Sequence, residues 1–191
     1  MSLFEKIVYQ NELYHLNTDF IGNDQYAYKK GLNSTMALLK CQHKWFQWLD
    51  SNAYCVRIFS FDFSKAFDMV PHDILCNKLK HLNINPYIYN WIISFLSNRK
   101  QRVKVDGVLT EFLDVNRGVA QRTILGPILF SVMVNDIKVI DPTCSLLGKF
   151  ADDLTLSVPI RNGKSDISSL EVLNVKKWAE ENRMKLNLDK T

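Results

Sequence analysis

Two adjacent carboxylates, Asp152 and Asp153, stand between two apolar segments of β-strand character, Ser145–Lys149 and Leu154–Val158. This arrangement predicts a hairpin with both carboxylates at or near its tip. Two like charges on a tight turn repel each other, and a divalent cation between them makes the arrangement favourable. Hard oxygen ligands suit Mg²⁺, which proteins hold with one or two carboxylates and the phosphates of a substrate.

Asp62 is a third carboxylate with a strand pattern beside it. It ends the segment Val56–Phe61, whose residues alternate as in a strand. If this strand neighbours the hairpin, Asp62 completes a cradle for two metal ions. An isolated pair of aspartates is more often a solvated turn, so the metal hypothesis depends on Asp62.

Other patterns predict the elements that position these carboxylates. Asn85-Pro86 predicts a helix start, because Asn caps helices and Pro suits the first turn. Asp106-Gly107 between alternating residues predicts the turn of a second hairpin over 102–115. Ser34 or Thr35 is the expected N-cap of the helix that follows. We expect helices over about 1–22, 35–49, 73–81, 87–98, 127–137 and 168–182, and further strands over 54–62 and 185–188.

Composition sets broad limits on the function. The chain has 191 residues, is 47% hydrophobic and carries a net charge of +4, which fits one domain that is compatible with nucleic acid. It shows no signal peptide, and its most apolar run, Ile124–Val134, is too short to span a bilayer. We therefore expect an intracellular protein with no membrane partner. The cysteines lack metal-ligand spacing and are expected to be reduced thiols: Cys41, Cys55, Cys76 and Cys144.

Several blocks of the sequence, in this order, resemble the motifs of reverse transcriptases, and most closely those of non-LTR (LINE-like) retrotransposons. Three blocks carry the resemblance: FDFSKAFD at 61–68, RGVAQRTILGPILF at 117–130 and FADD at 150–153. Two flanking blocks, QYAYKKG at 25–31 and LNLDKT at 186–191, extend it over nearly the whole chain.

The resemblance implies an α/β (α+β) right-hand polymerase with fingers and palm, and with no thumb within this chain. The fingers would comprise about 1–53 and 72–122, and the palm about 54–71 and 123–191. The palm would hold an antiparallel sheet with helices on one face. The implied activity is that of an RNA-directed DNA polymerase, which adds dNTPs to a DNA primer on an RNA template. The implied cofactor is two Mg²⁺ ions, with Mn²⁺ as a substitute, and the implied location is nuclear or cytoplasmic.

The resemblance also assigns residues to the metal site. Asp62, Asp152 and Asp153 match the metal-binding aspartates of the family, and the backbone carbonyl of Phe63 would be a further ligand. Lys190 matches a lysine near the leaving phosphate, where it would act as a general acid.

Other residues match positions that contact the nucleotide. Phe67 matches the gate that excludes a ribose 2′-hydroxyl, and Gln121 matches a residue that holds the nucleotide and template. Lys29 and Lys30 fall in the block that meets the triphosphate. By residue type alone, Phe67 is more often core and the lysines are more often solvated.

A basic segment separates two of these blocks. Its charges could be a solvated face or could contact the phosphates of a template–primer duplex. The candidate nucleic-acid contacts are Arg99, Lys100, Arg102 and Arg117.

The chain departs from the family pattern at two positions of the 117–130 block. Ala120 stands where Pro is usual, which is a mild change that frees one φ angle. Arg122 stands where Gly is usual, and Gly permits positive φ or a close ligand approach. We expect Arg122 and the absent thumb to leave this chain weak or inactive as a polymerase.

Three alternatives stay open. The first is a non-catalytic nucleic-acid-binding remnant of a decayed mobile element, which Arg122 favours and the three aspartates oppose. The second is a different palm enzyme, such as a nucleotidyl cyclase, which would need the aspartate pair but neither Phe67 nor the 117–130 block. The third is a chain without a stable fold, because the palm face that a thumb would cover is apolar.

Overall fold

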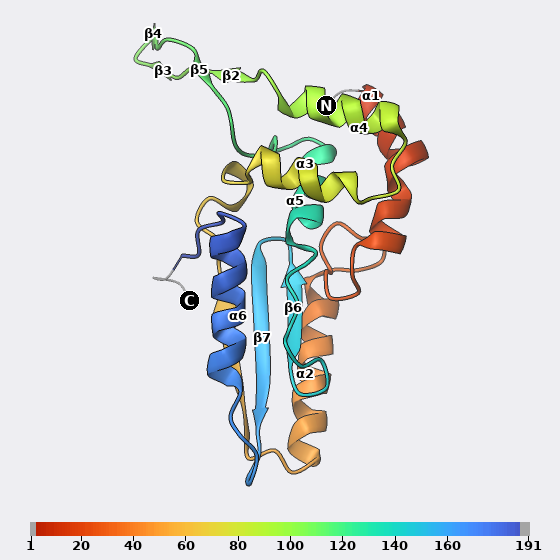
Figure 1. The fold of residues 1–191 in the computed structure, drawn as a ribbon, viewed down its shortest axis with the longest axis vertical. Helices are drawn as coiled ribbons and strands as arrows, with labels where there is room; N and C mark the ends of the chain where they lie inside the picture. Colours follow the sequence, from red (N-terminus) through yellow and green to blue (C-terminus); the bar gives the residue numbers. More distant parts are fainter. Residues whose placement is uncertain (1–2, 188–191) are drawn as a thin grey trace.

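A three-stranded antiparallel sheet lies in the lower half of the protein as drawn in Figure 1. The computed structural model describes residues 3–187. Its order is β1 (Cys55–Phe61), β7 (Asp153–Ile160) and β6 (Leu146–Phe150), so that β7 lies in the middle. Phe61 pairs with Leu154, and so does Lys149 of β6. The predicted strand and hairpin are therefore neighbours in one sheet, and this register brings the end of β1 to the tip of the hairpin.

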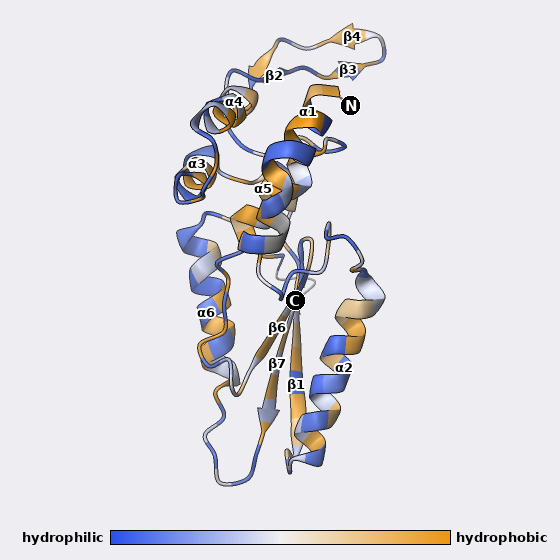
Figure 2. Ribbon diagram, turned by 90° about the vertical axis from the view of Figure 1, so that its right-hand side faces the viewer, coloured by the Kyte–Doolittle hydropathy of each residue, from blue (hydrophilic) through white to orange (hydrophobic). Residues whose placement is uncertain are grey.

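The sheet carries a helix on each face, whereas the sequence predicted helices on one face only (Figure 2). On one face, Trp45 of α2 (Ser34–Asp50) donates its indole N–H to Ser157 Oγ at 2.8 Å. On the other, Arg57 of β1 donates to Ser168 Oγ at the N-terminus of α6 (Ser168–Glu181) at 3.0 Å. Consecutive residues of β7 are buried, so both faces of the central strand need cover.

A second layer of helices lies beyond one end of the sheet (Figure 1). It comprises α3 (His72–Lys80), α4 (Pro86–Leu96) and α5 (Leu125–Val134), together with α1 (Leu3–Val8). Every residue of α5 except Pro127 is buried, so this helix forms the centre of the layer. Two π-helical turns, Tyr9–Leu13 and Leu16–Phe20, continue the chain after α1.

Helix starts follow local capping chemistry. Asn85 Oδ1 accepts from the backbone N–H of Tyr87 at 2.9 Å, which confirms the predicted start of α4. The N-cap of α2 is Asn33, one residue before the predicted Ser34, and its Oδ1 accepts from Met36 N at 2.9 Å.

The predicted second hairpin projects from the helical layer (Figure 1). Its inner strands are β3 (Lys104–Val105) and β4 (Val108–Leu109), and its outer pair is β2 (Lys100–Gln101) with β5 (Leu113–Asp114). Asp106 and Gly107 have φ of +49° and +86°, and a type I′ turn needs positive φ at both positions. The four strands are exposed along their whole length.

The strand predicted at 185–188 is reduced, within the described residues, to a bridge between Leu186 and Phe63. Over the described residues, no helix combines the length and apolar character needed to cross a membrane.

Candidate functional site

The turn between β6 and β7 is held by a side chain from the first block of the chain. Gln25 is only 1% exposed, and its Oε1 accepts from Ala151 N at 3.1 Å and from Ala27 N at 3.0 Å. Ala151 has φ of +55°, a left-handed conformation that costs energy for any residue except Gly. Gln25 therefore fixes the turn that presents Asp152.

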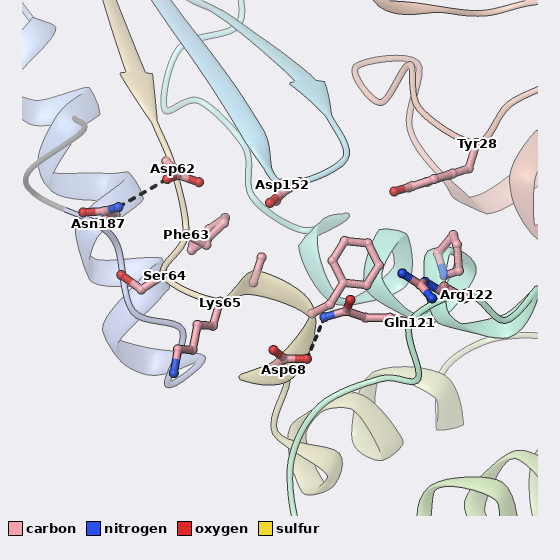
Figure 3. Close-up of a pocket in the computed structure, with 13 residues that line it drawn as sticks. Tyr28, Asp62, Phe63, Ser64, Lys65, Asp68, Gln121, Arg122, Asp152 and Asn187 are labelled. Atoms are coloured by element: carbon pink, nitrogen blue, oxygen red, sulfur yellow. Dashed lines mark hydrogen bonds between the residues drawn. The ribbon is translucent and has the colours of Figure 1, made fainter. Parts of the chain in front are cut away.

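Asp62 is held at the end of β1 by the last described segment. Asn187 donates its backbone N–H to Asp62 O at 2.8 Å and its Nδ2–H to Asp62 Oδ2 at 3.3 Å (Figure 3). Ser64 N donates to Lys185 O at 2.8 Å. Neither backbone bond of this bridge uses the Phe63 carbonyl, the group predicted as a metal ligand.

Asp62 and Asp152 line one cavity of about 490 Å³. The cavity also contains the predicted nucleotide-contacting residues Phe67 and Gln121 (Figure 3). Its remaining lining residues are Tyr28, Phe63, Ser64, Lys65, Ala66, Asp68, Arg122, Pro127 and Asn187.

Asp153 is exposed and does not line this cavity. It lines a second cavity of about 220 Å³ between α2 and the hairpin, beside Cys41 and Trp45. The structure thus brings together two of the three predicted metal-ligating carboxylates and directs the third toward α2.

Phe67 is both a core residue and a cavity residue, the two roles that the sequence suggested for it. Its ring stacks on Phe130, with centroids 4.5 Å apart and planes 16° from parallel, and it packs against the core. The same side chain lines the cavity that contains Asp62 and Asp152.

Arg122 has φ of +59°, a left-handed conformation that Gly, the residue expected here from the resemblance, adopts without steric cost. Its side chain is exposed and lines the cavity.

Tyr28, on the same cavity, has φ of +62° and is 44% exposed. Burial and the nearby Asp152 charge raise the pKa of Tyr28. Such backbone conformations concentrate at functional sites.

Two of the three predicted lysines, Lys29 and Lys30, do not line the cavity. Lys29 Nζ donates to Ile21 O at 2.7 Å and to Gly22 O at 2.9 Å, and burial lowers the pKa of this lysine. Lys30 is exposed, and Lys190 lies outside the described residues.

Lys149 is a fully buried lysine near the tip of the hairpin, where it pairs with Leu154 one step before the turn. Its Nζ donates to Val134 O at 3.0 Å and Asn135 O at 3.2 Å, and lies 3.2 Å from Asp24 Oδ2. Asp24 also pairs with Lys138 at 2.9 Å. Burial lowers the pKa of Lys149 to about 8, while the Asp24 charge opposes this shift.

A family model described as reverse transcriptase (RNA-dependent DNA polymerase) matches residues 4–191. The chain belongs to the reverse transcriptase family. The predicted family is confirmed by this match, which covers every element described above except the first residue of α1.

Relatives of this reverse transcriptase chain come from mobile elements. It is 30% identical over 162 residues to the probable RNA-directed DNA polymerase from transposon BS of Drosophila melanogaster. It is 31% identical over 150 residues to the RNA-directed DNA polymerase from mobile element jockey of the same species. These matches cover 81% and 74% of the chain but only 18% and 16% of the relatives, so the chain spans under a fifth of their length.

The fold resembles that of telomerase. The structure of telomerase from Candida Tropicalis with a fragment of telomeric RNA superposes with a TM-score of 0.69 at 14% identity, covering 98% of this chain and 34% of telomerase. The apo enzyme gives 0.67 at 16% identity, covering 97% of this chain and 35% of telomerase. These likenesses confirm the predicted α+β polymerase fold.

The donor set of this reverse transcriptase site fits Mg²⁺. Asp62 and Asp152 offer hard carboxylate oxygens on a cavity open enough for phosphates and water, which supply the remaining ligands in Mg²⁺ sites. Among residues 3–187, no three or more His, Cys, Asp or Glu side chains form a closed metal site.

The predicted nucleic-acid contacts lie on the projecting hairpin and the segment after it. Arg102 lies 4.6 Å from the Phe112 ring centroid, and Lys100 is 3.8 Å from Asp114 in an exposed ion pair. Arg99 is half-buried and Arg117 is exposed. None of these four residues lines the cavity.

Among the site residues to which the prediction from sequence gave no role, three are distinguished by their contacts or backbone conformation. Gln25 and Tyr28 lie in the QYAYKKG block, and Asn187 lies in the LNLDKT block. Their presence in blocks that resemble family motifs is the one signal that could have singled them out.

Proposed function

We propose that this chain is the catalytic region of an RNA-directed DNA polymerase of a non-LTR retrotransposon. The reaction transfers a deoxynucleotide from a dNTP to a primer 3′-hydroxyl, whose oxygen attacks the α-phosphorus while pyrophosphate leaves. The observation that carries the proposal is the shared cavity of Asp62 and Asp152 with Phe67 and Gln121. The names of the mobile-element relatives support the same activity. We expect it to act in the nucleus or cytoplasm, as the resemblance implies.

Asp62 and Asp152 would hold Mg²⁺, with the Phe63 carbonyl as a further ligand. Asp153 would join them only by turning its side chain from the second cavity toward the first. When bound, two such ions lower the pKa of the 3′-hydroxyl and stabilise charge on the departing pyrophosphate. The protein's own contribution is to hold Asp62 through Asn187 and the Asp152 turn through Gln25, so that both carboxylates are positioned beforehand.

The nucleotide would lie between the carboxylates and the opposite cavity wall. Phe67 would exclude a ribose 2′-hydroxyl, because its ring is held in place by Phe130. Gln121 would hold the nucleotide against the template. Lys190 would protonate the leaving group. Lys29 and Lys30 lie outside the cavity lining, so they would meet the triphosphate only at the cavity entrance, and Lys29 would first have to leave the carbonyls of Ile21 and Gly22.

The RNA template and DNA primer would run past the projecting hairpin. Arg99, Lys100, Arg102 and Arg117 would neutralise backbone phosphates there. In this reading the fingers comprise about 1–53 and 72–122, and the palm about 54–71 and 123–191.

A second candidate function is a nucleic-acid-binding remnant without turnover. Arg122 favours it, because a long cationic side chain lines the cavity at a position with left-handed φ where the family has Gly. Binding would then persist while polymerisation does not.

The two candidates are separated by primer extension on an RNA template with Mg²⁺ or Mn²⁺. The native chain is compared with Asp152→Asn and with Asp50→Asn, a matched change at an exposed position of α2. Extension by the native chain and Asp50→Asn, reduced more than about 100-fold in Asp152→Asn, supports the polymerase. Duplex binding without extension in all three proteins supports the remnant.

A further inference from the structure

Two segments that line the cavity are joined along their backbones. Val119 N donates to Phe67 O at 2.8 Å, and Gly118 N donates to Val70 O at 2.8 Å. His72 Nε2 donates to the Gly118 carbonyl at 2.7 Å. The segment that follows Asp62 and the segment that leads to Gln121 are therefore one joined unit.

Gly118 permits the close approach of these segments. Its φ is +88°, and a Cβ at this position would lie 2.8 Å from the backbone oxygen of Asp68. Any other residue would push the two segments apart, so the separation between Asp68 and the 117–121 loop is tightly set.

One side-chain bond joins the two segments within the cavity. Gln121 Nε2 donates to Asp68 Oδ1 at 2.9 Å (Figure 3). A carboxylate only accepts hydrogen bonds, so the amide nitrogen must face Asp68 and the amide oxygen must point away from it. Asp68 thus selects one of the two orientations open to the Gln121 amide, and Asp68 follows Phe67 directly in the chain.

We propose that Asp68 is a positioning residue, which orients the Gln121 amide so that its oxygen is the acceptor offered to the incoming nucleotide. The inference rests on the proposed polymerase function. It gives the third carboxylate of the cavity a task distinct from metal binding. Through Asp68, the position of Gln121 is also tied to that of Phe67.

Two substitutions separate the hydrogen bond from the negative charge. Asp68→Asn removes the charge and keeps an oxygen that accepts from Gln121 in the native orientation, although its NH₂ group could also donate to the Gln121 oxygen in the flipped one. Asp68→Leu has a similar shape and removes both. Single-nucleotide extension should give Asp68→Asn a kcat/KM for dNTP within about threefold of native. Asp68→Leu should lose about tenfold, mainly in KM, as expected for a hydrogen bond to a charged group.

A double variant tests whether Asp68 acts through Gln121. In a Gln121→Leu background, adding Asp68→Leu should change kcat/KM by less than about twofold, because the shared bond is already absent. Additive losses, or a loss in Asp68→Asn as large as that in Asp68→Leu, would overturn the proposal and assign Asp68 a role through charge.

A spectroscopic readout keeps the test independent of turnover. The side-chain amide ¹⁵N–¹H signals of Gln121, assigned by their disappearance in Gln121→Leu, should shift in Asp68→Leu and stay near their native positions in Asp68→Asn. Unshifted signals in Asp68→Leu would overturn the orientation. If Asp68→Leu does not fold, Gln121→Glu breaks the same bond from the other side and should raise KM likewise. Absence of extension by the native chain above the Asp152→Asn blank would count against the polymerase, while the amide signals still decide the orientation.

Discussion

Gln25 accepts the backbone N–H of Ala151, although 126 residues separate them in the chain. The turn that carries Asp152 is therefore held by a side chain from the first block rather than by residues of the hairpin. This contact makes the position of a proposed metal ligand depend on a buried amide.

Replacing Gln25 tests that dependence. Gln25→Leu keeps the volume but leaves the N–H groups of Ala151 and Ala27 without their acceptor, so we expect a loss of about 2 kcal/mol in unfolding free energy. Primer extension per folded molecule should also fall, because the turn that carries Asp152 is no longer held in place. Urea unfolding and extension are compared with Gln42→Leu, an exposed glutamine of α2. Equal behaviour of the two variants would contradict the role of Gln25.

Arg122 can be separated into its backbone and its side chain. Arg122→Gly removes the guanidinium and the left-handed strain of about 1 kcal/mol, whereas Arg122→Ala removes only the guanidinium. We expect primer extension to rise in both variants if the side chain obstructs the cavity, and thermal stability to rise more in Arg122→Gly. A decrease in extension in both would show that the guanidinium contributes a phosphate contact.

Phe67 is predicted to select deoxynucleotides. Phe67→Val should raise incorporation of ribonucleotides relative to dNTPs, because the smaller side chain leaves room for a 2′-hydroxyl. Phe67→Tyr keeps the ring and is the matched control, with selectivity near that of the native chain. The ratio of kcat/KM for rNTP and dNTP is the measurement. If this ratio does not change in Phe67→Val, Phe67 serves to pack against Phe130 and does not select the nucleotide.

The buried Lys149 gives stability a defined pH dependence. Its pKa is about 8 in the folded chain against an ordinary 10.5, so the unfolded chain binds more protons between these values. The contribution of Lys149 to stability therefore rises with pH through this window and is lost as pH falls through about 8. From pH 7.5 to pH 10, the unfolding free energy of the native chain should rise by about 2 kcal/mol relative to that of Lys149→Met.

Urea unfolding at a series of pH values measures this difference. Lys40→Met, at an exposed position of α2, is the matched control for other groups that titrate in the same range. A difference between native and Lys149→Met that does not change with pH would show that the buried amine titrates outside this window.

The projecting hairpin should account for part of the salt dependence of duplex binding. Arg99→Gln with Arg102→Gln should reduce the slope of log affinity against log salt by about 2, since each phosphate contact contributes about one counterion. Lys176→Gln with Lys177→Gln removes the same charge from the exposed face of α6 and should leave the slope unchanged. If the two double variants have the same slope, the duplex does not contact the projecting hairpin.

Local sequence patterns correctly predicted a helix start and a hairpin turn. Asn85-Pro86 starts a helix and Asp106-Gly107 makes a turn because the required φ angles and caps involve only neighbouring residues. The proximity of Asp62 and Asp152 was predicted on the condition that the strand before Asp62 neighbours the hairpin, and the pairing of β1 with β7 meets this condition.

Hydrogen bonds between segments far apart in the chain could not be predicted from local patterns. Neither the bond from Ala151 to Gln25 nor that from Gln121 to Asp68 follows from a periodicity. The direction of Asp153 depends on which face of β7 meets α2, and an apolar strand buried on both faces does not disclose this. For the same reason, the sequence predicted helices on one face of the sheet and missed the other.

The pairing of β1 with β7 has a consequence for how the site tolerates change. Seven consecutive residue pairs, from Cys55–Ile160 to Phe61–Leu154, set the distance between the strand end that carries Asp62 and the turn that carries Asp152. That distance is fixed by backbone hydrogen bonds, which substitutions of surrounding side chains do not remove. Changes at cavity-lining positions such as Arg122 should therefore leave the two carboxylates in place, so that their effect on primer extension reports on the cavity wall and not on the spacing of Asp62 and Asp152.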